Sequence, residues 1–241
     1  MLANRLIGLA RGADYATEVL ADSPTAYWRV SGSALDDVVG TADVTSLPSG
    51  VSSAASIVPG AGGQSLAMTG ANAVTLTAGS WAPSGNADRS MEVWFTTTAS
   101  PATSDATSPG LMGYGASNTR NAFNLRPANT GDASPADFAY KAWVWADDLV
   151  VTNSVDWNTG SRVHAVVTYN GTSRALKLYL NGAEVGSRTL GGNLTTTSGT
   201  TFYIGGNFVG VPWVGNLQEP AVYASELSAE RILAHYNAGI A

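Results

Sequence analysis

The stretch RVHAVVTYNGTSRALKLYLNG, residues 162–182, contains the strongest structural signal in the chain. Its two apolar segments, residues 162–169 and 176–181, are rich in Val, Leu and Tyr, which favour β-strands. Asn170-Gly171 and Asn181-Gly182 follow these segments, and Asn-Gly pairs adopt the positive φ angles that tight hairpin turns require. Two such turns in succession predict an antiparallel β-meander.

Short apolar runs bounded by Gly, Pro, Asn and Ser extend this strand pattern along most of the chain. They lie at residues 27–30, 66–68, 74–76, 90–97 and 202–204. Met91, Val93 and Phe95 occupy alternate positions, which is the period of a strand with one core-facing side. With 44% hydrophobic and only 12% charged residues, the 241-residue chain predicts one all-β domain with a single large core.

Helical patterns are confined to the two ends of the chain. A cap at Asp14 precedes apolar residues at helical spacing up to residue 21, and a cap at Ser228 precedes a second such pattern. We therefore divide the chain into residues 1–25, an N-terminal arm with a short helix that serves docking, and residues 26–241, a body built of strands with a short C-terminal helix.

Charge and composition exclude several classes of protein. Eighteen acidic and 12 basic residues give a net charge of −6, which disfavours binding to nucleic acid and to anionic membranes. The chain has no cysteine and therefore no disulfide or thiolate metal site. The apolar stretch in residues 1–11 is short, is interrupted by Asn4 and Arg5, and lacks a cleavage pattern. We therefore predict that the chain has no signal peptide and does not insert into a membrane. We also predict that it is made in a cytoplasm.

Several short motifs follow one another in order along the body. They are AYWR at 26–29, QSLAM at 64–68, MEVWF at 91–95, VHAVVTY at 163–169, LYLNG at 178–182, YIGG at 203–206 and LSAE at 227–230. Together they resemble the laminin-G-like branch of the concanavalin A-like lectin/glucanase superfamily, in which LYLNG corresponds to a Tyr-x-(Asp/Asn)-Gly hairpin. The resemblance implies that residues 26–241 form a two-sheet antiparallel β-sandwich, the concanavalin A-like jelly roll.

A narrower resemblance concerns the opening segment. Residues 15–30, with LADSP at 20–24 leading into YWR at 27–29, are similar to the start of laminin-G-like domains in tail and other virion proteins of bacteriophages. This similarity implies a minor tail or capsid-surface protein, made in the host cytoplasm and located on the virion. Its arm would bind other virion proteins, and its lectin-like body would bind glycans of the host surface. Repeated sites on a virion are compatible with a homo-oligomer. The alternative is a purely structural protein that decorates and stabilises the virion.

A glycan hydrolase is the third hypothesis, and the spacing of the carboxylates argues against it. A glycosidase needs two carboxylates that flank one bond, and strand side chains face the same cleft only at alternate positions. Asp36-Asp37 and Asp147-Asp148 are adjacent pairs, and Glu92 has no carboxylate neighbour. We therefore predict a non-enzymatic protein without catalytic residues.

Two aromatic clusters are candidate sugar-binding sites, because aromatic rings stack on sugars while amides and carboxylates bind their hydroxyls. Trp143, Trp145 and Asp147 alternate on one face of a predicted strand. The second cluster, in a Gly-rich loop near the end of the chain, consists of Asn207, Phe208, Pro212 and Trp213, and we expect Trp213 to be exposed. Core packing is an equally open alternative for Trp143 and Trp145, since rings at period two fit either side of a sheet.

The family resemblance also implies candidate calcium ligands, although the predicted binding role requires no cofactor. The family's Asp and Gly after the Tyr-Trp motif correspond to Asp37 and Gly40. Its later Asp-Glu pair reads Gln218-Glu219 here, and the neutral amide of Gln218 attracts a cation less strongly than Asp. A calcium site at Asp37, Gly40 and Gln218 therefore competes with a purely structural role in which Asp37 caps a turn.

Overall fold

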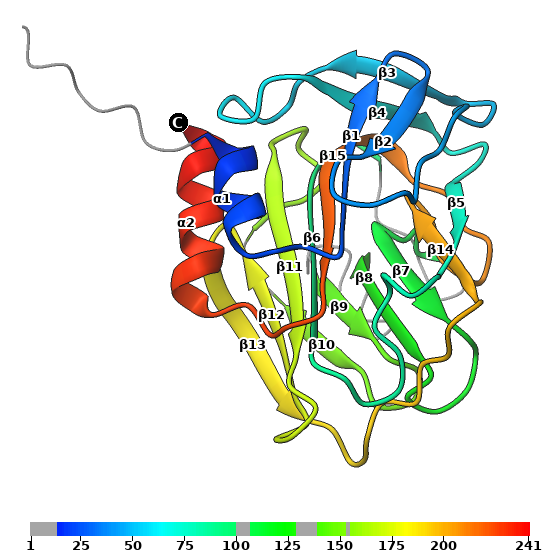
Figure 1. The fold of residues 1–241 in the computed structure, drawn as a ribbon, viewed down its shortest axis with the longest axis vertical. Coiled ribbons are helices and arrows are strands. Elements are labelled where there is room, and N and C mark those ends of the chain that lie inside the picture. The colour runs from blue at the N-terminus through cyan, green and yellow to red at the C-terminus, as the bar shows by residue number, and fades with distance from the viewer. Residues whose placement is uncertain (1–13, 100–106, 129–138, 153–154) are drawn as a thin grey trace, which may run out of the picture.

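The computed structural model describes residues 14–99, 107–128, 139–152 and 155–241. Two antiparallel sheets pack face to face, and two helices lie together on the outer side of the larger sheet (Figure 1). The predicted all-β sandwich with a short helix near each end of the chain is confirmed. No helix within the described ranges is long and apolar enough to cross a membrane.

The larger sheet has nine strands in the described part of the chain. Their order is β13-β12-β11-β6-β15-β1-β2, and β3 pairs with β4, which in turn pairs with β15. The strands are β1 (Ala26–Ser31), β2 (Ala34–Asp37), β3 (Val51–Ala55), β4 (Gln64–Thr69), β6 (Arg89–Thr96), β11 (Val163–Tyr169), β12 (Ala175–Leu180), β13 (Ala183–Thr189) and β15 (Val214–Tyr223). The predicted meander is formed by β11, β12 and β13.

The smaller sheet has the order β10-β9-β8-β7-β14-β5. Its strands are β5 (Val74–Thr77), β7 (Met112–Gly115), β8 (Ala122–Ala128), β9 (Ala139–Trp143), β10 (Leu149–Thr152) and β14 (Thr201–Ile204). Strands far apart in the sequence are neighbours in both sheets, so the sandwich closes through long-range pairing.

The two Asn-Gly pairs of the meander act differently. Asn181 and Gly182 have φ angles of 51° and 82°, the left-handed pair of a tight turn between β12 and β13, as predicted. Between β11 and β12 the left-handed residue is Arg174, with φ of 61°, and not Gly171. Gly171 is required for space, because a Cβ atom there would lie 1.9 Å from the carbonyl oxygen of Asn86.

Buried side chains form two clusters on opposite sides of the larger sheet. The main core lies between the two sheets and includes Trp28 and Trp157. The second cluster lies between the outer face of the larger sheet and the helices, and it includes Trp94. The larger sheet is therefore covered on both faces, and its tryptophans pack inside the protein.

Both helices begin at the predicted caps and pack on the sandwich. The side chain of Asp14 caps α1 (Tyr15–Ala21), and that of Ser228 caps α2 (Ala229–Ile240). Tyr15 and Val19 are fully buried in the cluster beneath the helices. Helix α1, predicted as part of the docking arm, packs on the sandwich, because its apolar face is buried there. Residues 1–13, the rest of the predicted arm, lie outside the described residues.

Candidate functional site

The outer face of the smaller sheet carries polar and aromatic side chains. In β8, Leu125 faces the main core. Because strand side chains alternate between faces, Asn124 and Arg126 point to the opposite side. They pair with Trp143 and Lys141 of β9, respectively, so these four side chains lie next to one another. This face of the sheet therefore combines an amide, two cations and an indole ring, and all four side chains are buried.

Three aromatic rings form one cluster on this face. The ring centroid of Trp143 lies 4.4 Å from that of Phe208 and 5.5 Å from that of Trp145, and the Trp145 and Phe208 centroids are 5.6 Å apart. All three rings lie outside the two buried apolar clusters of the described residues. Trp143 is 6% exposed, whereas Trp145 and Phe208 are half-buried. Rings gathered outside a core offer an apolar surface to a ligand.

The predicted alternation of Trp143, Trp145 and Asp147 along one strand is wrong, because β9 ends at Trp143. Trp145 and Ala146 have φ angles of 67° and 61°. These two left-handed residues turn the chain, and Trp145 stacks on Trp143 with an angle of 23° between the ring planes. Phe208 reaches the same place from the loop between β14 and β15.

Two cations border the ring of Trp143. The Arg126 Cζ atom lies 3.8 Å from the ring centroid and the Lys141 Nζ atom 5.6 Å from it, both within the range of cation–π attraction. Lys141 also forms an ion pair of 2.9 Å with Asp148. Sequence reasoning missed Arg126, although its alternation with Asn124 was the available signal. Both cations are buried, and they hold the indole in place.

Asp147, a predicted ligand residue, is buried and fully engaged within the protein. Its carboxylate forms ion pairs with Arg188 at 2.7 Å and with Arg120 at 3.4 Å, and it accepts a hydrogen bond of 2.7 Å from the backbone N–H of Gly191. These contacts hold together the loops beside the ring cluster. Asp147 is a structural residue of the site and does not face a ligand.

Trp213 and Asn207, the other predicted ligand residues, are also buried. Trp213 is 1% exposed and packs edge-on against Phe95 in the main core, so the expectation of an exposed ring is wrong. The chain folds back there, since the Trp213 backbone N–H donates to the carbonyl of Gly205 at 2.9 Å. The amide of Asn207 donates to the carbonyl of Ser108 at 2.8 Å and accepts from backbone N–H groups of its own loop.

The candidate calcium ligands Asp37 and Gln218 are engaged in hydrogen bonds within the protein. Asp37 accepts hydrogen bonds from the backbone N–H groups of Tyr27 at 3.1 Å and Ala42 at 3.1 Å, which is the turn-capping role. Gly40 leaves room for that carboxylate, since a Cβ atom there would lie 2.5 Å from its Oδ2. Gln218 Oε1 accepts from the backbone between β3 and β4. Within the described ranges, no three His, Asp or Glu side chains are arranged to hold a metal ion.

A buried polar cluster beneath the helices connects both histidines to Glu92. His164 Nε2 lies 2.7 Å and His235 Nδ1 3.0 Å from the Glu92 carboxylate, which also accepts a hydrogen bond from Tyr223. Burial alone raises the pKa of Glu92, but the charge of His235 and the hydrogen bonds of both histidines outweigh burial and hold that pKa well below its usual range. These side chains are buried, so they stabilise the fold and do not face a ligand.

The two antiparallel sheets, with rings and polar side chains on an outer face, define a lectin-like β-sandwich domain. The sequence model of the concanavalin A-like lectin/glucanases superfamily matches residues 68–233, and the chain belongs to this superfamily. A comparison with curated proteins found no match.

Solved structures share the fold at low sequence identity. Domain 4 of AbnA, a GH43 extracellular arabinanase from Geobacillus stearothermophilus solved in complex with arabinotriose, matches with a TM-score of 0.64 and 16% identity over 88% of this chain and 98% of that domain. The binding domain of Paraclostridial Mosquitocidal Protein 1 matches with a TM-score of 0.65 and 12% identity over 90% of this chain and 52% of that one. The Ruminococcus gnavus IT-sialidase CBM40 bound to alpha2,3 sialyllactose matches with a TM-score of 0.52 and 13% identity over 70% of this chain and 95% of that one. The chain thus has a fold found in carbohydrate-binding domains.

Proposed function

We propose that this chain is a non-enzymatic glycan-binding domain that holds a sugar on the ring cluster of Trp143, Trp145 and Phe208. The observation that carries the proposal is that these rings stack on one another outside both cores, with Trp145 and Phe208 half-buried. The apolar faces of sugars pack on such rings. Two of the structural neighbours were solved with a bound oligosaccharide.

The state of the buried carboxylates supports a binding role without catalysis. Glycoside hydrolysis requires two carboxylates on either side of a bound sugar. Glu92 is engaged by two histidines, Glu219 by Tyr27, and Asp147 by two arginines. None of these three carboxylates is available to a ligand at the ring cluster.

The experiment is a glycan-array screen followed by affinity measurements on Trp145→Ala and Phe208→Ala. Each substitution removes a stacking surface, and we expect at least a tenfold loss of affinity, equivalent to ~1.4 kcal/mol. Tyr203→Ala is the matched control, because Tyr203 is a half-buried ring on the same sheet face outside the cluster. Unchanged affinity in both cluster variants contradicts the proposed site.

The proposed setting is the surface of a bacteriophage virion, where residues 1–13 bind other virion proteins and the sandwich binds host-surface glycans. The support is the similarity of residues 15–30 to the start of phage laminin-G-like domains. Deletion of residues 1–12 is expected to abolish association with particles that lack the protein, while the sandwich stays folded. Retained association of the truncated protein contradicts this setting.

A purely structural decorating protein is the second candidate, and the burial of Trp213 favours it, because that role expects buried aromatic rings. The two candidates differ at the ring cluster. A decorating protein associates with particles and binds no glycan, whereas the proposed adhesin loses glycan binding when Trp145 is removed.

A further inference from the structure

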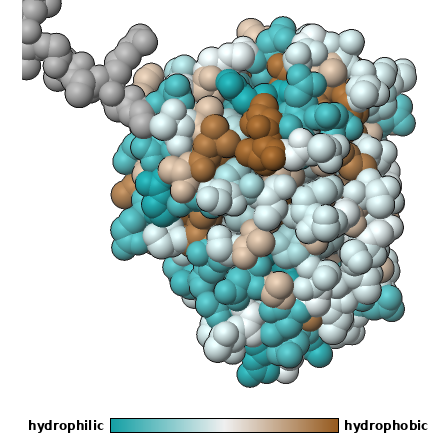
Figure 2. Space-filling view, in the orientation of Figure 1, coloured by the Kyte–Doolittle hydropathy of each residue, from teal (hydrophilic) through white to brown (hydrophobic). Residues whose placement is uncertain are grey.

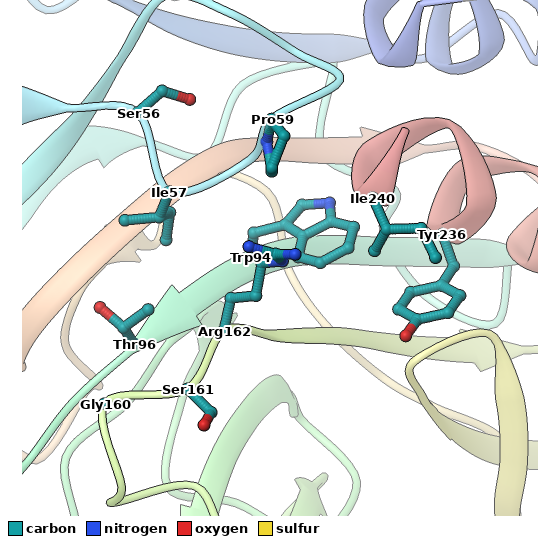
Figure 3. A pocket seen from close by; sticks show the side chains of 10 residues that line it. All are labelled: Ser56, Ile57, Pro59, Trp94, Thr96, Gly160, Ser161, Arg162, Tyr236 and Ile240. Atoms are coloured by element: carbon teal, nitrogen blue, oxygen red, sulfur yellow. The ribbon is translucent and has the colours of Figure 1, made fainter. Parts of the chain in front are cut away.

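A cavity of about 800 Å³ opens on the outer face of the larger sheet, beside the C-terminal end of α2 (Figure 3). Four separate segments form its walls: the loop between β3 and β4, strand β6, the turn before β11, and α2. Because the two sheets pack face to face, this cavity lies on the opposite side of the sandwich from the ring cluster. Its volume is within the range of roughly 300–1,000 Å³ that is usual for small-molecule sites.

The walls of the cavity are fixed by specific contacts. The side chain of Gln218 accepts a hydrogen bond of 2.7 Å from the backbone N–H of Ile57, which lines the cavity. The backbone N–H of Gly60 donates to the carbonyl of Gly239 at 3.1 Å and thereby joins the loop between β3 and β4 to α2. Because these contacts form the walls before a ligand binds, binding does not have to include the free-energy cost of ordering them.

Arg162 is the charged group of the cavity. The turn that precedes it is held by a hydrogen bond of 2.8 Å from the Gly160 N–H to the carbonyl of Thr97, the residue that follows β6. Arg162 is exposed and extends into the cavity (Figure 3). Arg29 and Arg231 form ion pairs with carboxylates, whereas Arg162 has no ion-pair partner among the described residues.

Apolar side chains surround this guanidinium. Ile57, Tyr236 and Ile240 line the cavity, and Ile240 is 42% exposed. Figure 2 shows hydrophobic side chains gathered on the surface between the helices and the β3–β4 region. An exposed apolar patch with a single unpaired cation favours a ligand that brings both an apolar portion and a negative charge.

We propose that this cavity is a second binding site, which takes a small organic carboxylate with an apolar portion. The planar guanidinium of Arg162 pairs with the carboxylate through two parallel hydrogen bonds, the arrangement for which arginine geometry is suited. The apolar portion of the ligand packs against Ile57, Tyr236 and Ile240. This inference does not rest on glycan binding at the ring cluster, since the two sites share no residue.

The test is an NMR titration of the ¹⁵N-labelled full chain with two carboxylates that carry an apolar group, phenyl β-D-glucuronide and N-acetyl-leucine, and with their uncharged counterparts, phenyl β-D-glucoside and N-acetyl-leucinamide. We expect saturable shifts of the Trp94 indole N–H and the Gly160 amide with a carboxylate and no such shifts with the uncharged molecules. Arg162→Gln is expected to lower the affinity at least tenfold. Arg174→Gln removes the same charge from the turn between β11 and β12 and is expected to have no effect.

The outcomes separate the sources of the carboxylate. Binding of the glucuronide alone assigns the cavity to an acidic sugar conjugate, and binding of N-acetyl-leucine alone assigns it to an amino acid or a peptide terminus; either supports the proposal. The absence of saturable shifts with both acids at tens of millimolar overturns it, as does equal affinity in Arg162→Gln. Trp145→Ala is expected to leave this binding unchanged, so failure of the ring-cluster site is distinguishable from failure of this one.

Discussion

The Nδ1 atom of His235 lies 3.0 and 3.1 Å from the two carboxylate oxygens of Glu92, and its Nε2 atom lies 2.8 Å from Oδ2 of Asp22. Both ring nitrogens therefore face carboxylates, and only a doubly protonated ring donates from both. His235 is on α2, Glu92 on β6, and Asp22 at the C-terminal cap of α1. One buried cation thus joins the two helices to the larger sheet.

This arrangement predicts a loss of stability at alkaline pH. Burial lowers the pKa of His235. The negative charges of Glu92 and Asp22, and the hydrogen bonds that they accept from the ring, outweigh burial and raise this pKa from 6.5 to about 9. Because the pKa of His235 is higher in the folded than in the unfolded chain, its protonation stabilises the fold. This stabilisation is fully present below the pKa of the unfolded chain and is lost as the pH rises through the pKa of the folded chain. We expect the melting temperature to fall between about pH 7 and pH 10. His235→Gln is expected to lack this pH dependence, and an equal fall in that variant contradicts the assignment.

Glu92→Ala is expected to destabilise the protein strongly, because it leaves the His235 cation buried beside an empty site. Removal of one partner of a buried ion pair costs about 3–5 kcal/mol, measured here as the free energy of unfolding in urea. The double variant Glu92→Gln, His235→Gln removes both charges and is expected to be more stable than Glu92→Ala. Asp36→Ala, at an exposed position of β2, serves as the control and should have little effect.

The sandwich could be predicted from the sequence because its signals are local. The alternation of apolar residues in β6 and the Asn181-Gly182 turn depend on neighbours in the chain, and the structure confirms both. The caps at Asp14 and Ser228 are local in the same sense. In contrast, the pair of Glu92 and His235 joins residues 143 positions apart, and no local pattern indicates it.

The candidate site could be predicted only in part, because exposure is decided by tertiary packing. Gly and Pro around Trp213 are typical of a surface loop, yet the chain folds back and buries the ring against Phe95. The cluster of Trp143, Trp145 and Phe208 requires a left-handed conformation at Trp145, which a non-glycine residue adopts rarely. The sequence therefore indicated all three rings, but in two separate clusters, without the geometry that brings them together.

Trp213→Ala is expected to reduce stability and not ligand affinity. Truncation of a buried aromatic ring costs about 3–5 kcal/mol, because it removes apolar contacts and leaves a cavity. Trp145→Ala should cost much less, since this ring is half-buried and outside the cores. Urea unfolding of the two variants gives the comparison. A Trp213→Ala protein of unchanged stability and weakened glycan binding would place Trp213 in the binding site after all.

Chelation is expected to leave the melting temperature unchanged, because backbone N–H groups occupy the Asp37 carboxylate and the Gln218 carbonyl. Melting curves with EDTA and with added calcium should coincide. Asp37→Ala leaves buried N–H donors without an acceptor and should cost about 1–3 kcal/mol in either condition. A melting temperature that falls with EDTA and recovers with calcium contradicts the turn-capping role of Asp37.

Gly60→Ala is expected to separate α2 from the loop between β3 and β4. A Cβ atom at this position would lie 1.7 Å from the carbonyl oxygen of Ala238, so the backbone of the loop or the helix must move. Overpacking of this kind costs about 1–3 kcal/mol in the free energy of unfolding, which a thermal melt detects.

Gly191→Ala is the matched control, because its Cβ atom would meet the Asp147 carboxylate at 3.4 Å, an ordinary contact. Since Ile57 and Ile240 flank this junction in the cavity wall, Gly60→Ala should also weaken carboxylate binding, whereas Gly191→Ala should not. Equal stability of the two variants would show that the junction tolerates a shift and that the cavity wall is less rigid than its contacts indicate.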